Sequence, residues 1–170
     1  MLRRALLIAL CLVVPTVASS KKTSTAGSLE GVWKIVEIVT TGANASTIST
    51  PQPSLVIFTK RHYSFLYVHG AQPRPQFAPA KDPDNLTDAE KIARYEQWSR
   101  FTANAGTYEV KGSTLTRRPL VAKNETVMAK NSSLTNDFKL EGNTLWLIAK
   151  SDAGQPASET RTRLKRVELR

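Results

Sequence analysis

The stretch SLVIFTKRHYSFLYVH, residues 54–69, decides the fold. It holds two runs rich in β-branched and aromatic residues, 54–59 and 62–69, with only two residues between them. Runs of this length and composition favour β-strands, and the short gap is the spacing of a β-hairpin. Because successive side chains on a strand point to opposite faces, one face of the second run carries three aromatic side chains, Tyr63, Phe65 and Tyr67.

Similar runs lie on both sides of this hairpin. One precedes it and five follow it, which gives the further expected strands 31–40, 106–111, 113–118, 134–140, 144–150 and 160–168. Gly112 and the turn Glu141-Gly142-Asn143 mark two more hairpins. About eight short strands predict a mostly β domain, folded as a closed eight-stranded antiparallel up-and-down barrel, because closure removes the exposed edges of a single sheet. A β-sandwich is the alternative arrangement.

One inserted α-helix is expected between the strands. A proline-rich loop at 70–83 cannot be regular structure. Thr87 and Glu90 then form the sequence signature of a capping box, which predicts a helix from Thr87 to about 101–104. Apolar residues recur at every third position of this helix and form one stripe, made of Ala89, Ile92, Tyr95 and Trp98.

The N-terminus has the layout of a secretory signal peptide, with a basic start, the apolar run 5–14 and small residues after it. The apolar run is too short to cross a bilayer, which needs about 20 residues. We therefore expect a signal peptide at 1–19, a flexible linker at 20–28, one domain at 29–170 and a periplasmic or secreted location. The single cysteine, Cys11, lies in the signal peptide, so thiol and disulfide chemistry are excluded from the exported chain.

Composition and charge narrow the class of protein without naming a function. The 170 residues, of which 41% are hydrophobic and 22% charged, correspond to one globular domain and exclude a disordered chain. The net charge of +10 favours an anionic lipid or envelope surface as a partner, although a plain solvated basic surface explains it more simply. Nucleic acid is not expected, because the sequence has neither an aromatic-and-basic RNA motif nor a helix-turn-helix pattern.

No constellation of catalytic or metal-binding residues is visible. His62 and His69 lie seven positions apart on one expected strand, so they point to opposite faces and cannot share a metal. A phosphate-binding loop and a Gly-x-Ser-x-Gly elbow are absent. We therefore expect no enzyme activity, no metal and no cofactor. A barrel isomerase or cyclase acting on a bound lipid is a third, weaker alternative, for which no catalytic base can be named.

A set of large side chains could instead line an apolar cavity for a small ligand. An eight-stranded barrel is just wide enough for packed side chains or for one small ligand. Apolar pockets orient ligands with a few polar groups, and Arg118 or His69 would suit an acidic head group. The alternative is that the aromatic residues simply form the core. The expected ligand-binding residues are Tyr63, Phe65, Tyr67, Trp98, Phe101, Tyr108, Arg118, Phe138 and Trp146.

The segment Gly31-Val32-Trp33 resembles the Gly-x-Trp motif that opens lipocalins and the wider calycin group. The ordered set GVWKIVEI, SLVIFTKRHYSFLYV, FTANAGTYEVKGSTLTRRP and FKLEGNTLWL is similar to the bacterial lipocalin-like domain family over about 29–167, nearly the whole exported chain. One feature departs from ordinary lipocalins: the helix lies in mid-chain, whereas theirs follows the barrel.

This resemblance implies a barrel whose opening Trp33 closes one end, beneath a basic residue of the last strand. Arg163 and Arg166 are both candidates for that residue, and Gly31 belongs to the same motif. The members of this family mostly lack an assigned activity. The expected function is non-covalent binding of a small apolar or amphipathic molecule. The alternative is a structural or interaction protein of the cell envelope with a filled barrel.

Overall fold

A computed structural model describes residues 29–74, 76, 79–129 and 131–168. The expected signal peptide (1–19) and linker (20–28) lie outside the described residues. The elements follow one another as β1 (Gly31–Gly42), β2 (Ser46–Ile48), β3 (Ser54–Phe58), β4 (His62–Val68), α2 (Asp88–Ser99), β5 (Phe101–Lys111), β6 (Thr114–Ala122), η1 (Glu125–Met128, a 3₁₀-helix), β7 (Leu134–Glu141), β8 (Thr144–Lys150) and β9 (Ser158–Glu168).

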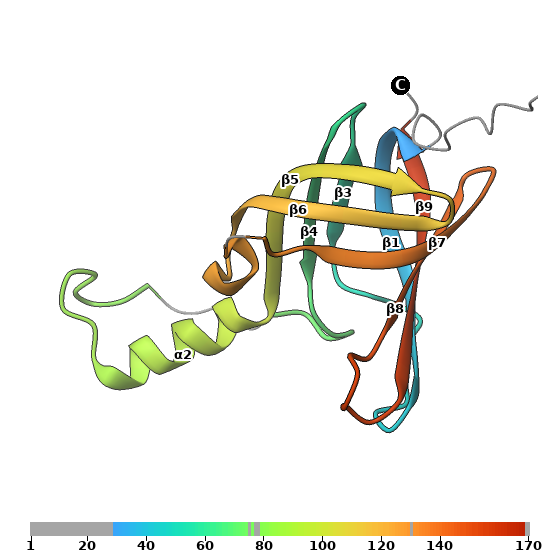
Figure 1. The fold of residues 1–170 in the computed structure, drawn as a ribbon. Helices are drawn as coiled ribbons and strands as arrows, with labels where there is room; N and C mark the ends of the chain where they lie inside the picture. The colour runs from blue at the N-terminus through green and yellow to red at the C-terminus, as the bar shows by residue number, and fades with distance from the viewer. Residues whose placement is uncertain (1–28, 75, 77–78, 130, 169–170) are drawn as a thin grey trace, which may run out of the picture.

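The sheet closes on itself as a barrel. Its strands lie in the order β1-β3-β4-β5-β6-β7-β8-β9, each antiparallel to the next. The last strand then returns to pair with β1, from Val32 opposite Glu168 to Gly42 opposite Ser158 (Figure 1). The predicted eight-stranded antiparallel barrel is therefore confirmed. The short β2, which the sequence did not predict, pairs with the second half of β1 and lies outside this cycle.

The predicted hairpins are also present. Thr59 N–H donates to His62 C=O at 2.9 Å and closes the turn between β3 and β4. Gly112 and Gly142 have positive φ values of 61° and 54°, each at the first central position of a two-residue turn. Glycine adopts this conformation without a steric penalty, as type II′ turns require.

Strands β5 and β6 are longer than their sequence pattern indicates, and the helix is shorter. The helix ends at Ser99, and β5 begins at Phe101 because residues 101–104 pair with Val68–Phe65 of β4. Backbone pairing thus decides the secondary structure of this segment, because its own composition does not distinguish helix from strand. Gly106 lies at a register shift between β5 and β6, where a Cβ atom would come within 2.0 Å of the Arg118 carbonyl oxygen.

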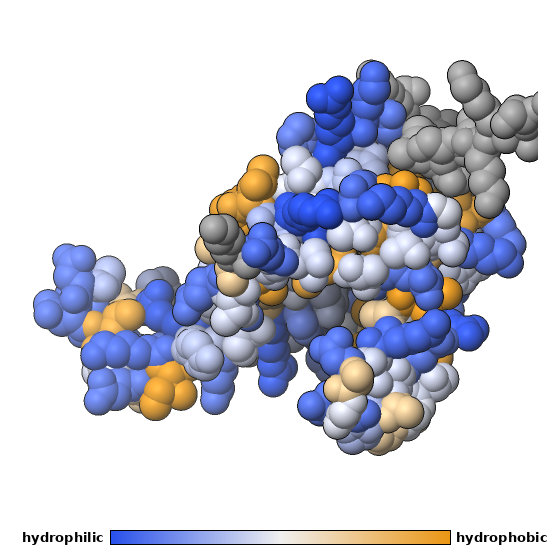
Figure 2. Space-filling model, in the orientation of Figure 1, coloured by the Kyte–Doolittle hydropathy of each residue, from blue (hydrophilic) through white to orange (hydrophobic). Residues whose placement is uncertain are grey.

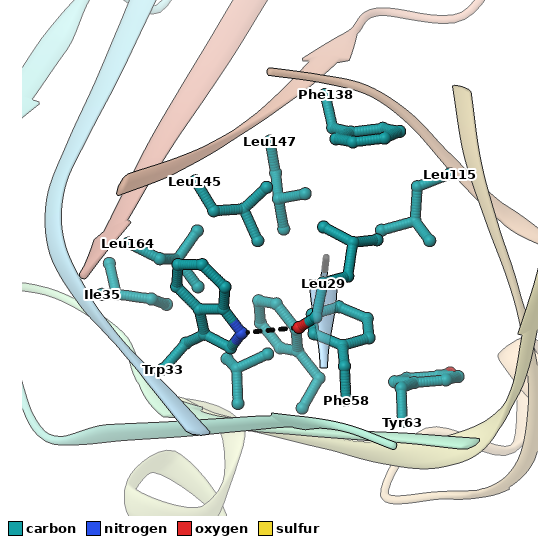
Figure 3. Close-up of a cluster of buried hydrophobic side chains, with 12 residues drawn as sticks. Leu29, Trp33, Ile35, Phe58, Tyr63, Leu115, Phe138, Leu145, Leu147 and Leu164 are labelled. Atoms are coloured by element: carbon teal, nitrogen blue, oxygen red, sulfur yellow. Dashed lines mark hydrogen bonds between the residues drawn. The ribbon is translucent and has the colours of Figure 1, made fainter. Parts of the chain in front are cut away.

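A dense apolar core lies inside the barrel. The Trp33 ring is fully buried there, and its indole N–H donates to the Leu29 carbonyl at 2.9 Å (Figure 3). Burying each such side chain contributes about 1.5–3 kcal/mol, so this cluster is the main source of stability. Strands all around the barrel contribute to the cluster, which contains Leu29, Trp33, Ile35, Val56, Phe58, Tyr63, Phe65, Leu115, Phe138, Leu145, Leu147 and Leu164.

Helix α2 projects away from the barrel (Figure 1). Its capping box is present: Thr87 N–H donates to Glu90 Oε2 at 2.8 Å, and Glu90 N–H donates to Thr87 Oγ1 at 3.3 Å. The apolar stripe is not packed on the core, since its three large side chains are more than half exposed, with Ile92 at 59%, Tyr95 at 71% and Trp98 at 55%. Figure 2 shows both hydrophobic and hydrophilic surface on the projecting part of the molecule that contains α2. Among the residues that the structure describes, no helix is long and apolar enough to cross a membrane.

Candidate functional site

One end of the barrel is closed by the pair expected from the opening motif. The Arg166 guanidinium lies 4.1 Å from the centre of the Trp33 ring, and its Nη1 donates to the Glu30 carbonyl. Arg163 does not share this role. It is on the outer face of β9, where its Nε is 3.1 Å from the Glu37 carboxylate. The reason is strand alternation, because residues 163 and 166 are three positions apart and must point to opposite faces.

The opposite end holds a pocket of about 730 Å³. Its walls come from the C-terminal turn of α2, the start of β5, the connection from β6 through η1, and the start of β7. The residues around it are His69, Tyr95, Trp98, Ser99, Phe101, Thr102, Ala103, Asn104, Lys123, Asn124, Glu125, Val127 and Leu134. We call it the mouth pocket. A smaller pocket of about 470 Å³ lies beside Glu30 at the closed end.

Lys123 joins the projecting helix to the mouth of the barrel. Its ammonium group donates to the carbonyl of Trp98 and, at 2.8 Å, to the carbonyl of Phe101. It also lies 5.6 Å from the centre of the Trp98 ring. A cation suits the C-terminus of a helix, where carbonyl groups lack partners within the helix. Lys123 therefore holds one wall of the mouth pocket in place.

His69 lies on the rim of the mouth pocket and is held by two neighbours. Its ring stacks on Tyr67, with 4.4 Å between the ring centres, and its Nε2 lies 2.6 Å from Thr102 Oγ1. Partial burial, and secondly the positive charge of Lys123, lower the pKa of His69 from its ordinary value. The imidazole is therefore neutral at pH 7 and can exchange hydrogen bonds with a ligand as donor or acceptor.

A buried arginine lies behind the inner wall of the mouth pocket. Arg117 of β6 is only 8% exposed, and its guanidinium carbon is 4.8 Å from the centre of the Phe65 ring and 5.5 Å from that of Tyr63. Its Nη2 donates to Asn136 Oδ1 at 2.8 Å, whereas its Nε has no hydrogen-bond partner. Burial lowers the pKa of Arg117 to about 10, so the side chain is still cationic at pH 7.

Two more polar atoms in this region are buried and without hydrogen-bond partners. They are the hydroxyl of Tyr63 and Oδ1 of Asn104, and Asn104 itself borders the mouth pocket. A buried polar atom without a partner costs about 1–3 kcal/mol, so each marks a place where a bound molecule would be stabilised. Within the described residues, no group of three or more His, Cys, Asp or Glu side chains could hold a metal ion.

The structure brings together some of the expected ligand-binding residues and separates others. Trp98 and Phe101 border the mouth pocket. Tyr67 does not border it directly, but its ring stacks on His69, which does. Four of the others, Tyr63, Phe65, Tyr108 and Phe138, point into the barrel, where they belong to the apolar core or pack against it.

Arg118 and Trp146 lie on the outer face, so the structure does not bring them together with the other expected ligand-binding residues. Arg118 is exposed and pairs with Glu109 at 2.8 Å, and Trp146 lies opposite Lys139 and Arg163 on the outer face. Residues 145–149 (LWLIA) are all apolar, so alternation could not be recognised around Trp146. Arg117 was missed although it lies two positions after Leu115, the one apolar residue that marks the inner face of its strand.

No known protein family matches this sequence, and no curated protein matches it either. Among solved structures, a similar one is the crystal structure of an uncharacterised protein from Bacteroides eggerthii, with 9% sequence identity and a TM-score of 0.42. The alignment covers 81% of this chain and 98% of the other. At this level of similarity the comparison carries no argument about function. The fold itself defines an eight-stranded antiparallel β-barrel protein with one inserted helix.

Proposed function

We propose that this protein is an exported, lipocalin-like barrel that binds a small amphipathic molecule non-covalently in the mouth pocket. The observation that carries the proposal is the pocket of about 730 Å³ with a buried, unpartnered Asn104 Oδ1 in its wall. This volume lies in the range of small-molecule sites, about 300–1,000 Å³. Because the side chains packed around Trp33 fill the closed end of the barrel, the proposed ligand enters from the mouth.

The chemistry of the mouth pocket supports an amphipathic ligand. Trp98, Phe101 and Leu134 supply apolar surface, and His69, Thr102 and Lys123 supply polar groups at the rim. An apolar tail would therefore be removed from water while a polar group is held at a defined place. In this proposal the protein binds its ligand without converting it, and residues 1–19 direct the chain out of the cytoplasm.

Titration with Nile red, an uncharged dye whose fluorescence rises in apolar surroundings, tests this proposal. We expect saturable binding to the wild-type protein. Leu134→Trp places a larger side chain in the pocket wall and should weaken dye binding at least about tenfold. Leu120→Trp is the matched control, because Leu120 is 69% exposed and does not border the pocket. Failure of the dye and of alkyl-chain competitors to bind the wild type would overturn the proposal.

A structural or interaction role in the cell envelope is the second candidate. The exposed stripe of α2 favours it, because the large side chains of Ile92, Tyr95 and Trp98 are together available to a partner. Lys34 and Lys165, exposed neighbours across the β1–β9 pairing, add positive charge on the outer face. Association with envelope fractions should then weaken as salt rises, since screening reduces attraction between exposed charges. Salt-independent association would count against this role.

A further inference from the structure

We propose that Arg117, with the hydroxyl of Tyr63, receives the carboxylate of an amphipathic acid whose apolar tail lies in the mouth pocket. This inference rests on the proposed function, because it names the chemical class of the ligand and the residues that select it. It adds a site of defined charge to a pocket that is otherwise characterised by size and apolar surface.

The first step of the argument is the position of Arg117. It lies directly opposite Leu134 in the pairing of β6 with β7, and Leu134 borders the mouth pocket. Its guanidinium stacks on Phe65, which lies opposite Asn104, another residue at the pocket wall. Arg117 is therefore adjacent to the pocket wall in two places, at Leu134 and, through Phe65, at Asn104. In this proposal the carboxylate end of the ligand passes Asn104 and Leu134 to reach Arg117.

The second step is the charge of Arg117. No carboxylate pairs with it among the described residues, and it contacts two aromatic rings and the neutral amide of Asn136. A buried charge is costly unless it is paired and hydrogen-bonded. Stacking on Phe65 and Tyr63 offsets part of that cost through cation–π attraction. The Nε–H of the guanidinium nevertheless has no hydrogen-bond acceptor.

The third step is the hydrogen-bonding capacity that remains. Arg117 Nε–H and Tyr63 O–H are both donors, and neither has an acceptor. Burial raises the pKa of Tyr63, and the nearby Arg117 lowers it by less, so the hydroxyl keeps its proton at pH 7. Two unpaired donors beside one positive charge fit an acceptor with two oxygens and one negative charge. A carboxylate has this composition and matches the planar guanidinium.

Charge balance favours a carboxylate over a phosphate monoester. Arg117 supplies one positive charge in the interior, and the ammonium of Lys123 at the mouth already donates to two backbone carbonyls. A carboxylate therefore neutralises the buried site, whereas a phosphate dianion would leave excess negative charge in a region of low dielectric. The chemistry points to a straight-chain or branched fatty acid, or another acid with an extended apolar part.

The test compares dodecanoate with dodecanol, which has the same chain length without the charge. Displacement of Nile red at pH 7.5, below the concentration at which either compound aggregates, gives both affinities. We expect dodecanoate to bind at least tenfold more tightly than dodecanol. Arg117→Met should remove this preference by weakening dodecanoate at least tenfold and leaving dodecanol unchanged. Arg118→Met is the matched control, because the neighbouring side chain is exposed on the outer face, and it should change neither affinity.

Replacing a buried charge by an apolar side chain of similar length is commonly neutral or stabilising, so Arg117→Met should fold, which a thermal melt checks. If it does not, Tyr63→Phe decides, since loss of the hydroxyl alone should weaken dodecanoate severalfold and spare dodecanol. Equal binding of dodecanoate and dodecanol, or full dodecanoate affinity in both variants, overturns the carboxylate site and leaves the ligand-binding function standing. Absence of binding by Nile red, dodecanol and dodecanoate overturns the proposed function itself, and this inference with it.

Discussion

Arg166 lies over the indole ring of Trp33, with 4.1 Å between its guanidinium carbon and the ring centre. The two residues are direct partners in the pairing of β1 with β9, so their contact also joins the first barrel strand to the last. The same arginine donates to the Glu30 carbonyl, and the indole N–H donates to the Leu29 carbonyl. Closure of the sheet and closure of this end of the barrel therefore depend on one cluster of contacts.

Trp33→Ala should lower the free energy of unfolding by about 3–5 kcal/mol, because it leaves a large cavity in the core. Arg166→Met should lower it by about 1–2 kcal/mol, since it removes the cation–π contact but keeps much of the apolar stem. Chemical denaturation measures both changes. Nile red affinity of the folded variants should stay unchanged, because the mouth pocket lies at the other end of the barrel. Trp146→Ala, on the outer face, is the control and should cost less than Trp33→Ala.

Gly31→Ala should destabilise the protein through a clash at the closed end. A Cβ atom at Gly31 would lie 2.8 Å from Arg166 Nη1 and 2.9 Å from the Glu168 carbonyl oxygen, at a φ of +134° that favours glycine. Gly154→Ala also faces a positive φ, +88°, but has open space around the new atom. A melting temperature that falls further for Gly31→Ala than for Gly154→Ala isolates the clash from the backbone strain. Equal losses would contradict this explanation.

His69 should make stability depend on pH near neutrality. Its pKa in the folded protein lies below the ordinary value of 6.5, through burial and then the charge of Lys123. Folding therefore favours the neutral ring, and its contribution is complete above pH 6.5 and is lost as the pH falls below that value. We expect His69→Gln to flatten the decline in melting temperature between pH 7.5 and 5. A decline identical to that of the wild type would show that His69 does not contribute.

Lys123→Met should loosen α2 without unfolding the barrel. The variant loses the hydrogen bonds to the Trp98 and Phe101 carbonyls, which join the helix to the mouth. Amide hydrogen exchange of residues 88–99 should become faster, while exchange in β1 and β9 stays slow. Lys91→Met is the control: Lys91 forms an exposed ion pair with Asp88 within the helix, and such pairs contribute little. Equal acceleration in both variants would contradict the role of Lys123.

Much of the architecture follows from short-range patterns. Alternating side chains, Gly112 and Gly142 at the turns, and the pairing of Thr87 with Glu90 each act over a few residues, so these elements could be predicted. The boundary between α2 and β5 could not. Residues 101–104 become a strand because β4 lies beside them, and no local pattern records that neighbour.

The candidate site was only partly predictable, and the reason differs from residue to residue. Arg117 and Arg118 are adjacent and chemically identical, but a one-residue step decides which is buried and which meets Glu109. Trp98 has the spacing of a core-facing stripe, and yet α2 turns this stripe towards solvent. Whether an apolar stripe finds a surface to cover depends on where the whole helix lies.

The order of residues alone thus determined that this chain forms antiparallel hairpins and one capped helix, because hydrogen bonding and backbone preference in those elements involve near neighbours. Closure of β9 on β1, the choice of Arg166 over Arg163, and the burial of Arg117 beneath the mouth pocket were decided only in three dimensions. Each of these depends on residues far apart in the chain that meet when the sheet curls into a barrel, and on the strand register set by that meeting.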